Sequence, residues 1–355
     1  MVAISEIDKY AIKAYEAIHG PTLNLGDISK IDPKDIPEHD LFTYSFPCQD
    51  LSVAGKQSGL IKGQTRSGLL YECEKVIEHR RPKYLLLENV KNLVGKKFKP
   101  QFDEWLKYLE DLGYTNYWQV LNAKEYGVPQ NRERVFVISI LGDHKPYEFP
   151  DPIPLDKCIK DIMEAEVDEK YYINKPFKLV NKGHQAELDI KGGMREPKIL
   201  CEGNVNPSGK GMNGNVFNSG GVSPTLRANE SVGPKILIPQ ATKKGYIEMD
   251  VPGVCDLAFP NSKTRRGRVQ EDGKIAPTLM TSSQELCYVE ETFRIRKLTP
   301  RECFRLMGMR DDDIDKIQEA GISNTQQYKM AGNSICIPVL EYIFKQLFIG
   351  DDKFE

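Results

Sequence analysis

The sequence has few of the patterns that mark metal-binding, secreted or membrane-spanning proteins. Its eight cysteines form no CxxC pair, which argues against a zinc site and against a disulfide framework. No uninterrupted apolar stretch approaches the roughly 20 residues that a membrane-spanning helix needs. The first ten residues, MVAISEIDKY, carry two acids and lack the basic flank and apolar run of a signal peptide. We therefore expect a reduced, cytoplasmic protein without a metal site.

The composition is that of an ordinary globular protein, with 40% hydrophobic and 28% charged residues. A chain of 355 residues is long enough to form one domain of usual size and a smaller one. The net charge of −2 is unevenly spread, because residues 181–281 hold 14 Lys and Arg against 10 Asp and Glu. The same segment holds 14 of the 28 glycines. A phosphate-binding middle region and a solvated surface with long hairpins explain these counts equally well.

Strand and helix patterns alternate along the first 150 residues. Short apolar runs predict strands, and apolar residues at helical spacing predict helices that end at Gly20, Pro82 and Gly113. The expected strands are 2–5, 41–46, 83–90, 117–123 and 134–140, and the expected helices are 8–20, 67–81 and 102–113. This alternation predicts an α/β fold with a doubly wound, Rossmann-like sheet.

Polar residues follow two of the predicted strands. FTYSF ends at Pro47 and Cys48, and KYLLLENV ends with Glu88 and Asn89. In a parallel sheet both strand ends meet at one edge, where ligands bind. A thiolate there is reactive if basic groups lower its pKa, and the candidates are Arg66, Arg132 and Arg134. The alternative is that Cys48 is simply a small buried apolar residue.

Six motifs then occur in the order found in cytosine-5 DNA methyltransferases. They are SFPCQDLS, RSGLLYE, LLLENV, QNRERVFVI, RKLTPRECFRLMG and AGNSICIPV. Each motif by itself is weak or moderate, but six in order are highly specific. The chain therefore resembles this family, in its bacterial or phage form, from near its start to about residue 345.

The resemblance implies a chemistry for the two strand ends. Cys48 would add covalently to carbon 6 of a cytosine, and Glu88 would act on ring nitrogen 3. Arg134, with Arg132 nearby, would contact the base and stabilise developing charge. The methyl donor would be S-adenosyl-L-methionine, and the cytosine would have to be flipped out of duplex DNA.

The resemblance also implies a set of cofactor-binding residues. Glu6 matches the acid that binds the ribose hydroxyls, and Asp27 with Ile28 matches the adenine-contacting positions. The remaining matches are Pro47, Asn333, Ser334 and Val339. Without the resemblance, Glu6 and Asp27 would be interpreted as surface acids.

The family usually begins with a strand and a glycine-rich turn that wraps the methionine end of the cofactor. Here Met1 precedes what corresponds to the second strand almost directly. A truncated start is the favoured explanation, and the alternatives are a real loss or supply by a companion N-terminal segment. We expect residues 1–355 alone to bind the cofactor poorly.

The middle of the chain holds a loose repeat, GNVFNSGGVSPTL from 214 and GRVQEDGKIAPTL from 267. Each copy looks like a hairpin that turns at its internal glycines. The family places such Thr-Leu segments in its target-recognition domain, where loops enter the major groove. The residues expected to contact DNA are Arg66, Gln49, Thr225, Arg227, Arg265, Arg266, Arg268 and Thr278. The alternative for the threonines is packing, and for the arginines a solvated surface.

The sequence thus predicts a monomeric, two-domain cytosine-5 DNA methyltransferase. Residues 1–150 with 290–355 would form the catalytic domain, and 151–289 a mostly β target-recognition domain. Restriction-modification or phage self-protection would be its setting, with a cognate restriction endonuclease as a possible partner. The rival interpretations are an RNA cytosine-5 methyltransferase and an inactive DNA-binding remnant.

Overall fold

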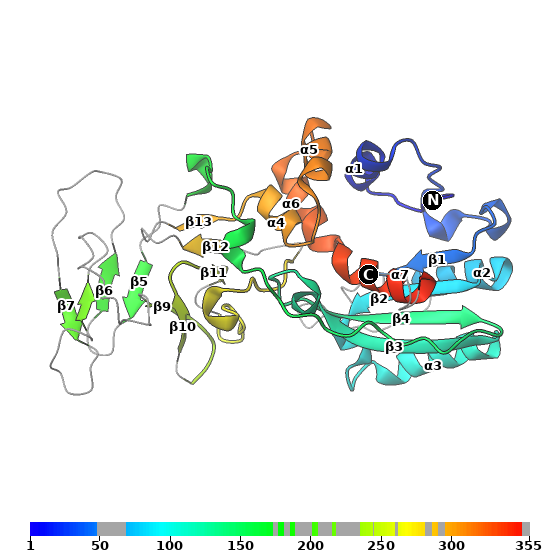
Figure 1. Cartoon of the computed structure of the whole chain (residues 1–355), viewed down its shortest axis with the longest axis horizontal. Coiled ribbons are helices and arrows are strands. Elements are labelled where there is room, and N and C mark those ends of the chain that lie inside the picture. The colour runs from blue at the N-terminus through cyan, green and yellow to red at the C-terminus, as the bar shows by residue number, and fades with distance from the viewer. Residues whose placement is uncertain are drawn as a thin grey trace. The chain divides into compact units, whose positions relative to one another are not determined.

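The computed structural model divides the chain into two compact units (Figure 1). Unit 1 comprises Met1–Asp156 and Phe304–Glu355, and unit 2 comprises Lys157–Cys303. The unit boundaries therefore fall 6 and 14 residues beyond the expected 150 and 289. The structure describes residues 1–47, 69–172, 177–180, 185–188, 201–204, 215–217, 235–243, 245–259, 262–280, 286–289 and 295–349.

Unit 1 is built on a four-stranded sheet with the order β1-β2-β4-β3. β1 (Leu41–Tyr44) and β2 (Tyr84–Val90) are parallel, whereas β4 (Glu133–Leu141) is antiparallel to both β2 and β3 (Tyr114–Asn122). The short connection between β3 and β4, which includes the 3-10 turn η6 (Ala123–Tyr126), leaves no room for a helical crossover. The sheet is therefore mixed. The expected strand at 2–5 appears only as one parallel bridge between Ile4 and Asn24.

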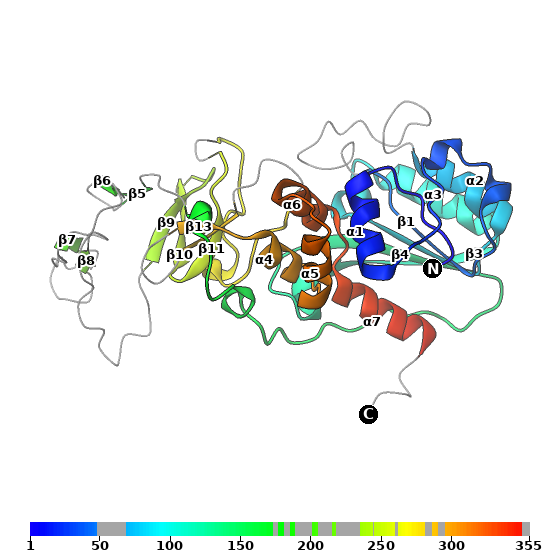
Figure 2. The same cartoon turned by 90° about the horizontal axis from the view of Figure 1, so that it is seen from above.

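Helices cover both faces of this sheet, which confirms the predicted α/β class (Figure 2). α2 (Leu70–Arg80) and α3 (Lys99–Asp111) lie on one side of the sheet, and α7 (Ile337–Phe348) lies on the other. The apolar face predicted for residues 102–112 is buried in the core through Phe102, Trp105, Leu106 and Leu109. Helical spacing alone was sufficient to identify these core residues.

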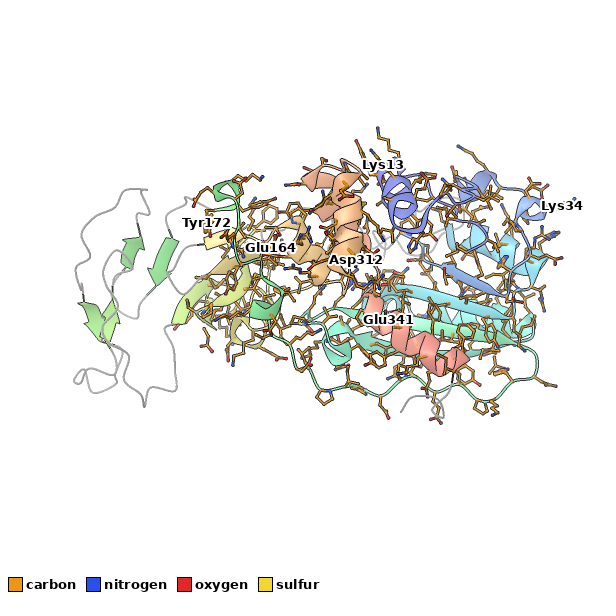
Figure 3. The ribbon with its side chains drawn as sticks, turned by 45° about the horizontal axis from the view of Figure 1, so that its top comes forward. Lys13, Lys34, Glu164, Tyr172, Asp312 and Glu341 are labelled. Carbon is orange, nitrogen blue, oxygen red and sulfur yellow. The ribbon has the colours of Figure 1, made fainter. Side chains whose placement is uncertain are left out.

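The N-terminal helix and the C-terminal segment of unit 1 are tied together. α1 (Lys9–His19) is capped by Asp8, whose side chain accepts from the N–H of Tyr10. The other carboxylate oxygen of Asp8 accepts a 2.6 Å bond from Lys329 of α6 (Asn324–Asn333). α5 (Asp311–Glu319) also contacts α1. Figure 3 marks these helices by Lys13 on α1 and Asp312 on α5, and α7 by Glu341.

One glycine allows the turn after α4 to pack closely against the start of α7. The short helix α4 (Pro300–Arg305) is followed by Gly308, whose φ is +75°. A Cβ at this position would overlap the ring of Pro338 in the first turn of α7. Only glycine satisfies both the left-handed backbone and this close approach.

Unit 2 is mostly β, as predicted. Its 3-10 turns are η7 (Ile159–Ile162), η8 (Glu169–Tyr171) and η10 (Glu271–Gly273). Its strands are β5 (Phe177–Val180), β6 (Gln185–Leu188), β7 (Cys201–Asn204), β8 (Asn215–Phe217), β9 (Lys235–Pro239), β10 (Tyr246–Asp250), β11 (Gly253–Asp256), β12 (Leu286–Val289) and β13 (Ile295–Lys297). They pair as β11-β12-β13 and as the antiparallel pairs β5-β6, β7-β8 and β9-β10. A small core, with Met249, Cys255 and Cys287 at its centre, holds the strands from β9 to β12 together.

A buried ion pair organises the part of unit 2 around β13. Arg296 and Glu302 are 2% and 0% exposed, and both guanidinium nitrogens donate to the carboxylate over 2.8 Å. The backbone N–H groups of Thr299 and Glu164 also donate hydrogen bonds to the Glu302 carboxylate. Figure 3 labels Glu164 and Tyr172, and Tyr172 bridges to Arg296 through the backbone. A buried charge that lost one partner would be strongly destabilising, so this pair is structural.

The second repeat copy, predicted as a hairpin, forms a 3-10 turn closed by a single bridge. Gln270 and Ile275 pair across η10, and Gly273 has a φ of +96°. A Cβ on residue 273 would lie 2.6 Å from the Cγ of Met249, so a larger residue does not fit. Most of the first copy lies outside the described residues.

Candidate active site

The parallel pairing of β1 and β2 brings two of the predicted polar strand ends together. Tyr44 lies opposite Leu87, so the segment Ser45–Pro47 runs beside Glu88 and Asn89. Asn89 is 2% exposed, and its side-chain amide donates a 3.1 Å bond to the carbonyl of Phe46. This bond fixes the backbone that leads to Cys48. Cys48 itself lies outside the described residues.

Glu88 forms an ion pair with Arg134 on the neighbouring strand. The antiparallel register places Arg134 opposite Val90, diagonal to Glu88 on the same sheet face. Nε of Arg134 lies 3.1 Å from Oε1 of Glu88, and their side chains are 16% and 9% exposed. Arg134 also donates to the carbonyl of Glu133 over 2.8 Å, so its guanidinium is held at the start of β4.

The carboxyl of Glu88 is shielded from water, which makes its ionised form costly. Burial raises the pKa of Glu88 above its ordinary value, although Arg134, Arg132 and a hydrogen bond from Ser45 oppose this effect. A carboxyl with a raised pKa is suited to hold or donate a proton near neutral pH. Glu88 is therefore equipped for proton transfer as well as for ion pairing.

Arg132, directly before β4, hydrogen-bonds to the C-terminal segment of unit 1. It is 3% exposed, and its Nη2 donates to the carbonyls of Gly332 and Ser334 over 3.1 and 2.8 Å. Gln130 is fully buried and donates to the carbonyl of Leu306 over 2.6 Å. The bonds of Arg132 hold its guanidinium beside the segment Gly332–Ser334.

We expect the Glu88→Gln variant to be increasingly more stable than the wild type as pH rises. The pKa of Glu88 is higher in the folded chain than its ordinary value of 4.5. The neutral carboxyl therefore contributes stability that is fully present below pH 4.5 and is lost as the pH rises through the folded-state pKa. Glutamine cannot ionise and does not lose this contribution. Thermal melts between pH 4 and pH 8 measure the difference.

Glu133→Gln is the matched control, because the carboxylate of Glu133 is 42% exposed and lies on the same strand as Arg134. A constant difference in melting temperature between Glu88→Gln and the wild type across this pH range would contradict a raised pKa.

The N-terminal cofactor candidates lie on two adjacent segments. The Ile4–Asn24 bridge aligns them, and Asn24 exchanges side-chain bonds of 3.1 and 3.0 Å with the backbone of Glu6. The carboxylate of Glu6 accepts from the N–H groups of Ile7 and Asp8 over 2.7 and 2.8 Å. These two backbone donors fix its orientation at the start of α1.

Asp27 and Ile28 follow on the second segment. Asp27 caps the turn η1 (Ile28–Lys30), and its bonds from the hydroxyl and N–H of Ser29 lower the pKa of its carboxyl. Ile28 packs against the main core of unit 1. The backbone of this segment is therefore held from one side by the cap and from the other by the core.

The C-terminal cofactor candidates occupy the end of α6 and the start of α7. Asn333 is exposed, Ser334 caps α6 through a 2.8 Å bond to the carbonyl of Met330, and Val339 is buried. Arg132 holds the backbone on both sides of Asn333. Pro47 is half-buried at the end of the segment after β1.

The candidates for DNA contact differ in their surroundings. Gln49, Arg66, Thr225 and Arg227 lie outside the described residues. Arg266 is exposed and donates to the carbonyl of Ala241 over 2.9 Å, and Thr278 is half-buried. Arg265 is half-buried in a 2.5 Å ion pair with Asp256.

Arg268 does not fit the role that the sequence suggested. It is 2% exposed, and its guanidinium donates to the carbonyls of Asp256, Ala258 and Phe259 over 2.5–2.9 Å. Its side chain is used inside unit 2 to hold a loop. We therefore withdraw Arg268 as a DNA contact.

Comparison with known proteins identifies this arrangement. The family model described as C-5 cytosine-specific DNA methylase matches residues 1–349. The chain belongs to this family. A type II methyltransferase of Lactococcus lactis subsp. cremoris is 40% identical, over 92% of this chain and 71% of that protein. An orphan methyltransferase of Bacillus phage SPR is 35% identical, over 98% of this chain and 91% of that protein.

Solved structures support the fold of this cytosine-5 methylase. The S. pombe Dnmt2 methyltransferase aligns with a TM-score of 0.55 at 17% identity, covering 98% of this chain and 90% of that one. The Entamoeba histolytica methyltransferase EhMeth aligns with a TM-score of 0.58 at 17% identity, covering 99% and 90%. No helix of the described residues is both long and apolar enough to cross a membrane.

Three residues that hydrogen-bond beside the candidate site were given no role in the sequence analysis, although Asn89 was noted there as part of a polar strand end. Asn89 stood in the ENV motif, Gln130 opened the QNRERV motif, and Ser45 preceded the proline turn. The motifs indicated that these segments matter. The partners that explain why, Phe46, Leu306 and Glu88, become visible only in the folded chain.

Proposed function

We propose that this chain transfers a methyl group from S-adenosyl-L-methionine to carbon 5 of a cytosine flipped out of a specific duplex DNA sequence. The observation that carries the proposal is the buried Glu88–Arg134 pair beside the segment that leads to Cys48, in a chain that belongs to the cytosine-5 methylase family. The family description names DNA, which favours DNA over the RNA alternative.

Carbon 5 of cytosine is too electron-poor to attack a methyl donor without activation. In the proposed reaction the Cys48 thiolate forms a bond to carbon 6, which makes carbon 5 nucleophilic. After carbon 5 gains the methyl group, a base removes its proton and the bond between the sulfur and carbon 6 breaks. A base inside the duplex is out of reach, so the cytosine must leave the stack.

Glu88 and Arg134 support the addition step. The protonated carboxyl of Glu88 donates to ring nitrogen 3 and draws electrons from the ring as the thiolate adds. Burial raises the pKa of Glu88, which favours the protonated form that this step needs. The Arg134 guanidinium, fixed by Glu88 and by the carbonyl of Glu133, stabilises the charge that develops on the base.

The residues around Glu6 fit the proposed methyl donor. A carboxylate held by two backbone N–H groups after a strand-like segment is a suitable acceptor for ribose hydroxyls. Asp27 and Ile28 would contact the adenine, and Pro47, Asn333, Ser334 and Val339 would line the rest of the site. When bound, the donor supplies an electrophilic methyl group on sulfur.

Bisulfite sequencing of DNA from cells that express the chain tests the proposal and reveals the target. Transfer of a radiolabelled methyl group to duplex DNA, with tRNA as the competing acceptor, separates the alternatives. Label in DNA at cytosine supports the proposal. Label only in tRNA would make the chain an RNA methyltransferase, and label in neither would make it an inactive DNA-binding remnant.

The setting we propose is restriction-modification or phage self-protection. The similar proteins include a bacterial type II methyltransferase and a phage orphan methyltransferase. A type II system would add a cognate restriction endonuclease as a partner, and an orphan would act without one. Resistance of cellular DNA to a panel of restriction enzymes, before and after expression of the chain, reports this protection directly.

We expect the Arg266→Ala variant to bind duplex DNA with a flatter salt dependence. If Arg266 contacts a phosphate, removing it should reduce the slope of log affinity against log salt by about 0.9. Arg265→Ala should change the slope less, because Asp256 already neutralises Arg265. The measurement is a binding titration at several salt concentrations.

Lys170→Ala is the control, because Lys170 is also exposed in unit 2 but pairs with Asp168. If Arg266→Ala changes neither the salt slope nor the affinity, Arg266 is a solvated surface residue and not a DNA contact.

A further inference from the structure

Phe259 combines exposure with an unusual backbone conformation. It lies in unit 2 just after β11 and is 56% exposed. Four described non-glycine residues have a positive φ, and Phe259, at +51°, is the one with an apolar side chain. Bulky residues rarely adopt this region. Pro260 follows it in the sequence, and a residue before proline favours extended backbone.

The surrounding structure forces this conformation. Buried Arg268 donates to the carbonyls of Ala258 and Phe259 over 2.6 and 2.5 Å, and the N–H of Ser262 donates to the same Phe259 carbonyl over 3.0 Å. Asp256 accepts from the N–H of Ala258 over 2.9 Å. A buried arginine thus holds the loop from inside, and the aromatic ring points outward without a comparable enclosure.

One cationic side chain lies against the exposed ring, and others occur on the same loop and on the hairpin joined to it. The Arg265 guanidinium lies 5.5 Å from the ring centre, and the loop is joined to the tip of the β9-β10 hairpin by the bond from Ala241 N–H to the Arg265 carbonyl. Segments 240–243 and 256–268 also contain three exposed cations, Lys243, Lys263 and Arg266, and one carboxylate, Asp256. Arg268 is buried and does not contribute to this surface. The carboxylate is already paired with Arg265.

We propose that Phe259 is a wedge that stacks on a base step of duplex DNA while the neighbouring cations hold the phosphates. An exposed apolar patch alone has no preferred partner. An exposed planar ring on a loop that carries exposed cations matches a polyanion with aromatic faces, and apolar side chains inserted between base steps are a known way to kink and unstack DNA. This role rests on the proposed function, since it assigns a contact to the same DNA substrate.

Stacking and phosphate contacts differ in their response to salt, which makes the wedge testable. Phe259→Ala should weaken binding of the full chain to a fluorescein-labelled plasmid duplex by about 5- to 100-fold, the usual effect of losing one base–aromatic stack. The salt slope should stay the same, because an apolar contact releases no counterions. Phe259→Trp should keep the wild-type affinity. Phe348→Ala, which removes a 50% exposed ring from α7 in unit 1, should have no effect.

Two further variants distinguish a DNA contact from a structural role. The fluorescence of the indole introduced by Phe259→Trp should be quenched when the duplex is added, whereas that of the indole introduced by Phe348→Trp should not. Phe259→Gly relieves the left-handed backbone, so its melting temperature should equal or exceed that of the wild type while its DNA affinity falls.

Wild-type affinity in Phe259→Ala, or no quenching in Phe259→Trp, would overturn the wedge. So would a lowered melting temperature in Phe259→Gly, because the ring would then be a packing element. These outcomes presuppose a wild-type chain that binds and methylates duplex DNA. If the wild type neither binds nor methylates duplex DNA, the proposed function itself is wrong. That result is separate from any effect of the Phe259 variants.

Discussion

Replacing Cys48 by alanine is expected to abolish methyl transfer, with a loss on the order of 10⁶-fold, as when other covalent nucleophiles are removed. The reason is that carbon 5 becomes nucleophilic only after sulfur has added to carbon 6. Duplex DNA with 5-fluorocytosine at the target should trap the wild-type enzyme covalently, because fluorine cannot leave as a proton does. A denaturing gel shows the adduct, and Cys48→Ala should form none.

Cys158→Ala is the matched control for this experiment. Among the cysteines whose side chains the structure describes, Cys158 is partly exposed and the others are buried: Cys73, Cys255, Cys287, Cys303 and Cys336. Burial raises the pKa of Cys73 to about 12, so this thiol is a poor nucleophile. Cys158→Ala should retain both activity and the adduct. An adduct that survives in Cys48→Ala would mean that another residue is the nucleophile.

The second large effect is expected for Glu88→Gln, which should slow methylation by about 10²- to 10⁴-fold, the usual contribution of a general acid. Glutamine preserves the shape of the side chain but cannot transfer a proton to nitrogen 3. Wild-type activity should fall as pH rises through the raised pKa of Glu88, and the variant should lose this dependence. Single-turnover rates across a pH series measure both.

Glu133→Gln tests whether any loss of negative charge near Arg134 has the same effect. Glu133 sits one residue before Arg134 and pairs with Lys91 over 2.7 Å on the exposed side. Its replacement should change the rate little. Equal methylation rates for Glu88→Gln and the wild type would exclude Glu88 from the mechanism, whatever rate Glu133→Gln shows.

Local patterns predicted those parts of the fold whose causes are local. The spacing of Phe102, Trp105 and Leu109 located α3, and the apolar run of 83–90 located β2, because helix and strand periodicity are properties of a short segment. The direction of β4 was not predictable in this way. Its apolar run is the same whichever way the strand lies beside β2, and the sheet contacts decide the outcome.

The site shows the same division between local and tertiary information. Motif order pointed to Glu88 and Arg134, but the 3.1 Å contact between them depends on a cross-strand register that the sequence does not display. Arg268 illustrates the opposite case. In the run TRRGRV its charge looked like that of Arg265 and Arg266, yet of these three it is Arg268 that carbonyl groups enclose. Burial of one arginine in a basic run is a tertiary property.

The reversed direction of β4 has a consequence for how this enzyme tolerates length variation. Arg134 stands at the beginning of its strand, whereas Glu88 stands near the end of its own. Because strand side chains alternate between faces, one residue inserted between Arg134 and Val137 would turn Arg134 to the opposite side of the sheet, away from Glu88. An insertion after Leu141, at the other end of β4, leaves this pairing frame intact. We therefore expect a one-residue insertion to be tolerated better after Leu141 than between Arg134 and Val137.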